Sequence, residues 1–200
     1  LKKKETVELA LFVRSKTPLL DKVLAAGVKV HVFADSGSVY NPKHIVRLIK
    51  LSRGFDIVHT HNTAPQLYGA VASLFCKAKF VTTEHTTNSH HRTWWFKPIE
   101  RWMYGRYSDI ISISEAAKQN VLSVVPLAKN KITVIPNGID AKVYYEAKTV
   151  SKEGLVENNK SKVILMVGRY SYQKDQATII KAMPLLYENT ELWLAGYGET

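Results

Sequence analysis

The sequence has very little cysteine and no long apolar run. Its 200 residues contain one cysteine, Cys76, so no disulfide can form within a single chain. Cys76 lies at helical spacing among apolar residues, where burial as a small apolar side chain is the favoured interpretation. No run of about eighteen apolar residues is present, which excludes a typical membrane-spanning helix, and the first residues lack the apolar stretch of a signal peptide. These absences fit a reducing, cytoplasmic location.

Acidic residues are scarce relative to basic ones. The chain has 17 Asp and Glu against 28 Lys and Arg, a formal net charge of +11. Nucleic acid, anionic lipid headgroups and phosphorylated substrates all suit such a charge, and so does a merely solvated basic surface. The cations are scattered instead of forming a block, and no pattern of aromatic and base-reading residues accompanies them. Nucleic-acid binding is therefore disfavoured.

Apolar and amphipathic stretches alternate along most of the chain. Residues 7–13 alternate as a strand does, Thr17-Pro18 opens a helix, and Gly27 ends it. Five further pairs of this kind predict repeated βα units around a parallel sheet. The expected strands that follow are residues 28–33, 55–59, 80–83, 110–113, 132–135, 163–167 and 192–195, and the expected helices start near residues 41, 65, 98, 115 and 176.

The alternation stops between residues 136 and 162. Pro136-Asn137-Gly138 is turn chemistry, and residues 142–160 are polar without a sustained apolar period. We therefore expect an α/β protein with residues 1–140 as one domain, 141–161 as a linker and 162–200 as the start of a second domain. A single βαβ unit of about forty residues cannot cover both faces of its strands, so the chain is expected to be a segment of a longer polypeptide, clipped at both ends.

Polar residues cluster where the expected strands end. Ligands of open parallel sheets bind at the carboxyl ends of the strands. His59 and His61 are two residues apart and should face the same way. Three interpretations stay open for them: hydrogen bonds at a strand end, contact with a hydroxylated substrate, or a metal site completed by His85 or Glu84.

A second cluster follows the strand at residues 163–167. Gly168-Arg169 comes directly after it, and Lys174 and Asp175 precede the next helix. Two cations, a glycine that permits close backbone approach and a helix start can together hold a diphosphate. Spacing alone does not separate this hypothesis from an ordinary surface arginine and lysine.

Five segments occur in a fixed order: residues 56–62 (DIVHTHN), 111–115 (ISISE), 134–140 (VIPNGID), 167–176 (VGRYSYQKDQ) and 192–198 (LWLAGYG). Together they resemble the retaining glycosyltransferases of group 1, family 4. The resemblance covers nearly the whole chain, and the order of the segments is more specific than any one of them. It implies the GT-B architecture of two Rossmann-like domains, with the N-terminal domain nearly complete and the C-terminal domain truncated.

The resemblance also implies residue roles. Arg169 and Lys174 match the pair that holds the donor diphosphate, Gly168 matches the close-approach glycine, and Asn137 joins the donor-binding set. His85 matches the position that faces the donor sugar near the reacting carbon, so the expected catalytic residues are His85, Arg169 and Lys174. The expected acceptor-binding residues are His59, His61, Asn62 and Glu84.

Two parts of the family pattern are missing from the sequence. The first strand with its glycine-rich loop would precede Leu1, and the acidic motif that contacts the donor sugar would follow Thr200. The 200 residues alone are therefore expected to be inactive. No cofactor or metal is expected, because fixed cations supply the charge that Mg²⁺ provides elsewhere.

The expected function is transfer of a sugar from a nucleoside diphosphate sugar to a saccharide or lipid-linked acceptor, in cell-surface polysaccharide or glycolipid synthesis. A sugar-nucleotide 2-epimerase of the same fold and a degenerate sugar-binding module are the alternatives. Basic charge together with Trp94, Trp95 and Trp102 suggests peripheral contact with the inner face of an anionic membrane.

Overall fold

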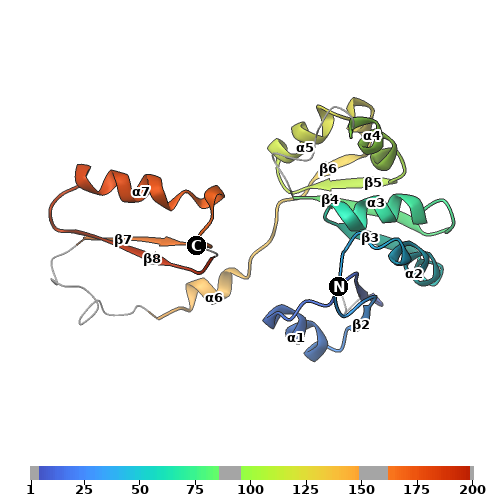
Figure 1. The fold of residues 1–200 in the computed structure, drawn as a ribbon, viewed down its shortest axis with the longest axis horizontal. Helices are drawn as coiled ribbons and strands as arrows, with labels where there is room; N and C mark the ends of the chain where they lie inside the picture. Colours follow the sequence, from blue (N-terminus) through green and yellow to red (C-terminus); the bar gives the residue numbers. More distant parts are fainter. Residues whose placement is uncertain (1–4, 86–95, 149–161, 199–200) are drawn as a thin grey trace. The chain divides into compact units, whose positions relative to one another are not determined.

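The chain divides into two compact units, Leu1–Ile139 and Asp140–Thr200. The computed structural model describes residues 5–85, 96–148 and 162–198. Strands and helices alternate in both units (Figure 1). Within the described residues, no helix is both long enough and apolar enough to cross a bilayer.

The described residues of the first unit form six strands, all of which pair in parallel. β1 and β2 form one sheet, and β3, β4, β5 and β6 form a second sheet in that order. Helices connect successive strands, as parallel pairing requires. The elements are β1 (Glu8–Leu11), α1 (Pro18–Ala25), β2 (Lys29–Val32), α2 (Lys43–Ser52), β3 (Ile57–His61), α3 (Thr63–Ala72), β4 (Lys79–Glu84), α4 (Lys97–Gly105), β5 (Asp109–Ser112), α5 (Glu115–Leu122), the 3₁₀ helix η1 (Pro126–Lys131) and β6 (Ile132–Val134).

Local chemistry sets several of these boundaries. Thr17 accepts a hydrogen bond from Leu20 N at the start of α1, and Ser114 accepts one from Ala117 N at the start of α5. Such caps satisfy amides that have no partner within the helix. Gly27, with φ of 68°, makes the left-handed turn that follows α1.

The core of the first unit lies between the four-stranded sheet and its helices. Ile110 of β5 and Val121 of α5 are fully buried, as are Tyr104 and Tyr107 at the end of α4. The Tyr107 hydroxyl donates to Gln66 O at 2.6 Å and shares a 2.9 Å hydrogen bond with the Thr60 hydroxyl. Tyr107 thus joins α3 and β3 beneath the end of the sheet, and its burial raises the pKa of its hydroxyl.

The second unit is a small parallel βαβ arrangement. Gly168 N donates to Ala195 O and Tyr170 N donates to Tyr197 O, so the pairing continues beyond its two strands. The elements are α6 (Ala141–Tyr145), β7 (Lys162–Val167), the 3₁₀ helix η2 (Tyr172–Lys174), α7 (Gln176–Ala182), the 3₁₀ helix η3 (Met183–Leu185) and β8 (Thr190–Ala195).

The predicted alternation of strands and helices is present, with shifts at several boundaries. β3 runs to His61, so His59 and His61 lie within the strand and not after it. The last predicted helix ends at Ala182, because Pro184 cannot continue α-helical hydrogen bonding and the chain tightens into η3. The predicted linker, residues 141–161, begins with the short helix α6, and its residues 149–161 lie outside the described part of the chain.

Candidate functional site

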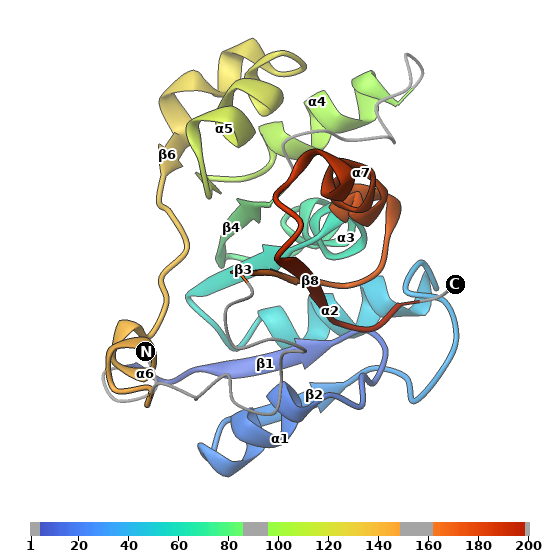
Figure 2. The same ribbon diagram turned by 90° about the vertical axis from the view of Figure 1, so that its left-hand side faces the viewer.

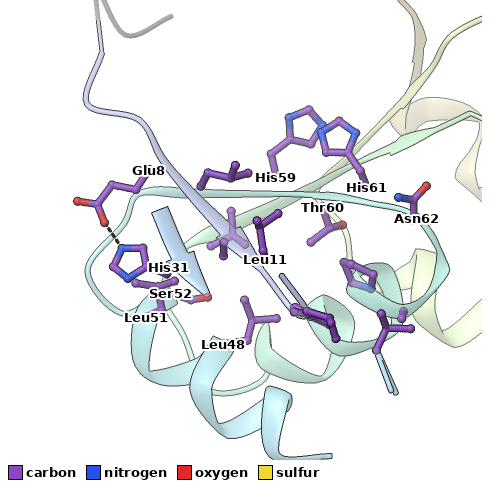
Figure 3. Close-up of a pocket in the computed structure, with 18 of the residues that line it drawn as sticks. Glu8, Leu11, His31, Leu48, Leu51, Ser52, His59, Thr60, His61 and Asn62 are labelled. Carbon is purple, nitrogen blue, oxygen red and sulfur yellow. Dashed lines mark hydrogen bonds and ion pairs between the residues drawn. The ribbon is translucent and has the colours of Figure 1, made fainter. Parts of the chain in front are cut away.

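Three histidines gather where β3 and β4 end. The ring centroids of His59 and His61 are 4.4 Å apart, and those of His61 and His85 are 5.3 Å apart. Figure 3 shows the His59 and His61 rings side by side at the rim of a pocket, as alternate residues of one strand should be. His85 joins them because it follows the last residue of β4, which pairs in parallel with β3.

Hydrogen bonds orient the three imidazoles. His59 Nε2 lies 2.7 Å from Thr83 Oγ1, and His61 Nδ1 lies 3.0 Å from His85 Nε2. Two ring nitrogens can share a hydrogen bond only when one carries the proton and the other does not. His61 and His85 therefore cannot both be imidazolium in this arrangement.

The environment favours the neutral forms of His59 and His61. Partial burial lowers the pKa of His59, and the charge of His85 adds to the effect. Partial burial also lowers the pKa of His61 to about 4, with further contributions from His59 and His85. Near pH 7 these rings are uncharged, so they can exchange hydrogen bonds with ligand hydroxyl groups but cannot attract an anion by charge.

Asn62 turns the chain sharply between β3 and α3. Its φ of 69° and ψ of 160° lie in a region that residues other than glycine rarely occupy. Asn62 O accepts a hydrogen bond from Gln66 N, which starts α3 directly after the strand. Strained backbone of this kind concentrates at functional sites, and here it stands beside the histidine cluster.

Glu84 is buried, whereas the other predicted acceptor-binding residues, His59, His61 and Asn62, are exposed. The Tyr104 hydroxyl donates to Glu84 Oε2 at 2.6 Å. This hydrogen bond ties the end of β4 to α4. The geometry therefore favours a supporting role for Glu84 beneath the site over direct contact with an acceptor, and nothing in the sequence spacing identifies Tyr104 as its partner.

A pocket of about 640 Å³ opens beside the histidines. His59, Thr60, His61 and Asn62 line one side of it, and most of its remaining wall is apolar. Glu8 Oε2 and His31 Nε2 are hydrogen-bonded at its far end, drawn as the dashed line in Figure 3.

In the second unit, Lys174 lies beside Gly168, the residue that precedes Arg169. The aliphatic part of Lys174 packs beside Gly168, where an added Cβ would be 3.7 Å from its Cγ and Cδ. Arg169 and Lys174 are exposed, and neither has a carboxylate partner among the described residues. An added Cβ at Gly196 would overlap the Gly168 carbonyl, so two strand ends approach closely here.

The sequence predicted that the start of α7 helps to hold a diphosphate, but the Asp175 carboxylate already occupies this position. Asp175, with φ of 51°, accepts hydrogen bonds from Thr178 N at 3.3 Å and from the Thr178 hydroxyl at 2.7 Å. The carboxylate thus satisfies a first-turn amide and brings negative charge to this end of the helix. Any anion bound here would depend on Arg169 and Lys174.

The remaining predicted residues are exposed or fall outside the described residues. Asn137 lies in the exposed segment after β6 and belongs to the first unit, whereas Gly168, Arg169 and Lys174 belong to the second. Trp94 and Trp95 fall within residues 86–95, outside the described part of the chain. Among the described residues, no group of three or more His, Cys, Asp or Glu side chains is arranged to hold a metal ion.

Known structures resemble this fold. Anabaena HepE in complex with UDP superposes with a TM-score of 0.76 at 16% identity, over 96% of this chain and 62% of that one. The UDP-GlcNAc 2-epimerase of Neisseria meningitidis gives a TM-score of 0.55 at 15% identity, over 94% of this chain and 65% of that one. The α/β fold is therefore Rossmann-like and matches GT-B structures.

Sequence comparison identifies the family. An uncharacterised glycosyltransferase of Methanocaldococcus jannaschii is 29% identical over 159 residues, which are 72% of this chain and 41% of that protein. Glycogen synthase of Mycobacterium tuberculosis is 27% identical over 154 residues, 72% of this chain and 36% of that enzyme. The chain thus spans about two fifths of the length of these relatives. The sequence pattern of Glycosyltransferase Family 4 matches residues 3–143, well over half of the chain, and the protein belongs to that family.

Proposed function

We propose that the full-length protein transfers a sugar from a nucleoside diphosphate sugar to a saccharide or lipid-linked acceptor, with retention of anomeric configuration. The observation that carries the proposal is the exposed Arg169 and Lys174 pair beside Gly168, in a chain of Glycosyltransferase Family 4. Cell-surface polysaccharide or glycolipid synthesis is the process we assign to it.

The chemistry requires stabilisation of a leaving diphosphate. An acceptor hydroxyl oxygen bonds to the anomeric carbon, the bond from that carbon to the phosphate oxygen breaks, and the hydroxyl proton passes to the released diphosphate. Arg169 and Lys174 would bind the diphosphate and stabilise the negative charge that grows on it. Because these cations are part of the chain, we expect turnover to persist when chelators remove divalent metal.

The histidine cluster suits the acceptor side of this reaction. His59, His61 and Asn62 would bind acceptor hydroxyls through neutral hydrogen-bonding groups, consistent with the lowered pKa values of both histidines. His85 would face the donor sugar near its anomeric carbon, and its hydrogen bond with His61 would link the two parts of the site. Glu84 would support this arrangement through Tyr104.

Donor binding by the full-length protein is the decisive test. Anabaena HepE has been crystallised with UDP and with UDP-glucose, so UDP-sugars come first in a calorimetric panel that also includes GDP- and ADP-sugars. Saturable binding of one donor and release of its nucleoside diphosphate would support the transferase. Failure of every donor to bind would favour a degenerate sugar-binding module instead.

The matched variants are Arg169→Ala and Lys181→Ala. Removing Arg169 should lower kcat by on the order of 100-fold, the cost of losing one charge-stabilising donor. Lys181 is an exposed lysine in the last turn of α7 and has no assigned role, so its removal should leave kcat unchanged. Equal activity in the two variants would remove Arg169 from the proposed mechanism.

A sugar-nucleotide 2-epimerase is the alternative enzyme, since the Neisseria meningitidis epimerase has a related fold. It would convert donor without acceptor and without releasing nucleoside diphosphate. Incubation of each donor alone, followed by separation of the sugar nucleotides, distinguishes the two reactions. The match to Glycosyltransferase Family 4 favours testing the transferase first.

We also propose peripheral contact with the cytoplasmic face of an anionic membrane. α4 exposes Trp102, and η1 exposes Leu127 with 94% of its surface accessible. Lys131 Nζ donates to Gly105 O and Tyr107 O, which places η1 against the end of α4. Exposed apolar side chains among cations suit an anionic interface. Exposed cations in and beside α4 and η1 are Lys97, Arg101, Arg106 and Lys129.

Vesicle sedimentation tests the membrane proposal. The protein should sediment with vesicles of phosphatidylglycerol and phosphatidylcholine and remain in solution with phosphatidylcholine alone. Trp102→Ala together with Leu127→Ala should weaken binding, whereas Leu24→Ala, at an exposed leucine of α1, should not. Binding without preference for the anionic lipid would contradict the proposal.

A further inference from the structure

Thr83 carries a buried hydroxyl next to the histidine cluster. β3 and β4 lie side by side (Figure 2), and Thr83 pairs with His61 in their register, so its side chain lies on the same face of the sheet as those of His61 and His59. Thr83 is 6% exposed, whereas both histidines are exposed. β4 pairs with β3 on one side and β5 on the other. The sheet itself therefore holds the Thr83 hydroxyl in place.

Among the described residues, this hydroxyl has one hydrogen-bond partner, His59 Nε2 at 2.7 Å. A hydroxyl can donate one hydrogen bond, and a neutral imidazole has one nitrogen that donates and one that accepts. If Nε2 carried the ring proton, it would donate to Thr83, and the buried Thr83 hydroxyl proton would have no acceptor. A buried donor without an acceptor costs free energy. The favoured arrangement therefore has Thr83 Oγ1 donating to an unprotonated His59 Nε2.

This hydrogen bond decides which nitrogen of His59 carries the proton. Partial burial lowers the pKa of His59, so the ring is neutral near pH 7 and carries a single nitrogen-bound proton. The tautomer of a neutral histidine is set by the hydrogen bond that its other nitrogen makes. Because Nε2 accepts from Thr83, the proton belongs to Nδ1. Within the described part of the chain, His59 Nδ1 forms no hydrogen bond, so its N–H is available to a ligand.

We propose that Thr83 is a positioning residue, which holds His59 as the Nδ1–H tautomer and makes this histidine a hydrogen-bond donor to an oxygen of the sugar acceptor. The inference rests on the proposed function, since the acceptor supplies that oxygen. A hydroxyl, ring or glycosidic oxygen has the lone pair that the N–H requires. The His59 ring stands at the rim of the pocket, on the side of β3 away from α2 (Figure 3), and is exposed there.

The tautomer also limits what His59 does in catalysis. Nδ1 already carries a proton and Nε2 accepts from Thr83, so neither nitrogen is free to remove the proton of an acceptor hydroxyl. His59 therefore binds and orients the acceptor, and the hydroxyl proton passes to the leaving diphosphate, as in the reaction proposed above. Thr83 acts through His59 without contacting the acceptor itself.

Proton–nitrogen correlation NMR of the imidazole rings in the full-length protein tests the tautomer. Such spectra distinguish protonated from unprotonated ring nitrogens, and His59→Gln identifies the His59 signals by their loss. In the unmodified protein, Nε2 of His59 should be unprotonated and Nδ1 protonated. Thr83→Val keeps the shape of the side chain and removes its hydroxyl, so it should give a mixture of the two tautomers. Thr83→Ser should restore the Nδ1–H form.

Thr82→Val is the matched control. Thr82 precedes Thr83 in β4, is fully buried, and donates its hydroxyl to Thr60 O at 3.1 Å, with its side chain on the opposite face of the sheet. Its loss removes the same buried group but should leave the His59 tautomer unchanged. In sugar transfer to p-nitrophenyl glucoside, a saccharide probe, Thr83→Val should raise the KM for the probe about 10-fold and leave kcat nearly constant. Thr83→Ser should restore the KM, and Thr82→Val should not alter it.

Two results would overturn the positioning role. One is a His59 tautomer that is Nε2–H in the unmodified protein or is the same in Thr83→Val. The other is an equal rise of KM in Thr82→Val, which would show that any lost hydroxyl of β4 weakens the site. Absence of sugar transfer in every variant, the unmodified protein included, would count against the proposed function, and the tautomer measurement would then decide this inference alone.

Discussion

At the scale of single residues, the His61 and His85 pair sets the chemistry of the candidate site. Their 3.0 Å hydrogen bond needs one unprotonated nitrogen, and the burial that lowers the pKa of His61 works in the same direction. Both effects favour a neutral His61 ring at neutral pH. A sugar acceptor offers hydroxyl groups, and neutral imidazoles suit hydroxyl groups better than cations would.

The first prediction concerns the pH dependence of stability. The pKa of His61 is about 4 in the folded protein and about 6.5 in an unfolded chain, so unfolding takes up protons below pH 6.5. The free energy of unfolding should therefore fall as the pH drops from 6.5 towards 4. Urea unfolding across this range should show a smaller loss in His61→Gln. NMR titration of the His61 ring in the unmodified protein should give a midpoint far below 6.5, and a midpoint near 6.5 would contradict the assignment.

The second prediction compares two glycines in helices. A Cβ at Gly69 would lie 2.6 Å from the Tyr107 hydroxyl and 2.8 Å from Thr60 Cγ2, so Gly69→Ala must displace these side chains or shift α3 itself. It should destabilise the protein by about 1–3 kcal/mol, as overpacking commonly does. Gly105→Ala is the control, because a Cβ there meets nothing within 4 Å. Equal midpoints of urea unfolding for the two variants would show that α3 adjusts freely.

Residue-level prediction from the sequence succeeded where a simple period applies. The spacing of His59 and His61 was enough to place their rings side by side. It could not reveal that Glu84 is buried against Tyr104, because that contact joins residues twenty apart through the packing of α4 on β4. The strained backbone of Asn62 was equally hidden, since it depends on how closely α3 follows β3.

At the scale of elements, apolar periodicity located the strands and helices but not their ends. β3 was expected two residues earlier than it occurs, because the apolar run begins at Phe55 whereas pairing with β4 begins at Ile57. The short helix α6 was missed because five residues show no apolar period. Its signal was Asp140, whose side chain accepts a hydrogen bond from Lys142 N and which has the residue type of a helix cap.

The third prediction tests such a cap. Ser114 accepts a hydrogen bond from Ala117 N at 3.1 Å at the start of α5. Ser114→Ala should lower the free energy of unfolding by about 1 kcal/mol, the usual cost of losing a serine cap. Ser15→Ala, in an exposed segment after β1, should change it little. Urea titration of both variants makes the comparison, and an unchanged midpoint for Ser114→Ala would mean that water replaces the cap.

At the scale of the whole chain, the two units differ greatly in how much they bury. The core of the first unit includes fully buried Tyr107 and Ile110, whereas none of the described residues of the second unit is buried. Leu165 and Val167 of β7 are 57% and 73% exposed. Small units bury too little surface to be stable by themselves, so the second unit should be the weaker one.

The fourth prediction follows from this difference. In the 200-residue chain, the amide signals of β7 and β8 should disappear at a lower urea concentration than those of β4 and β5, because each unit forms its contacts mainly within itself. Extending the chain beyond Thr200, as in the full-length protein, should raise the midpoint of β7 and β8, since added strands and helices would cover Leu165 and Val167. The β4 and β5 midpoint should stay constant under that extension. Coincident transitions of both units in the 200-residue chain would show instead that they unfold as one cooperative body.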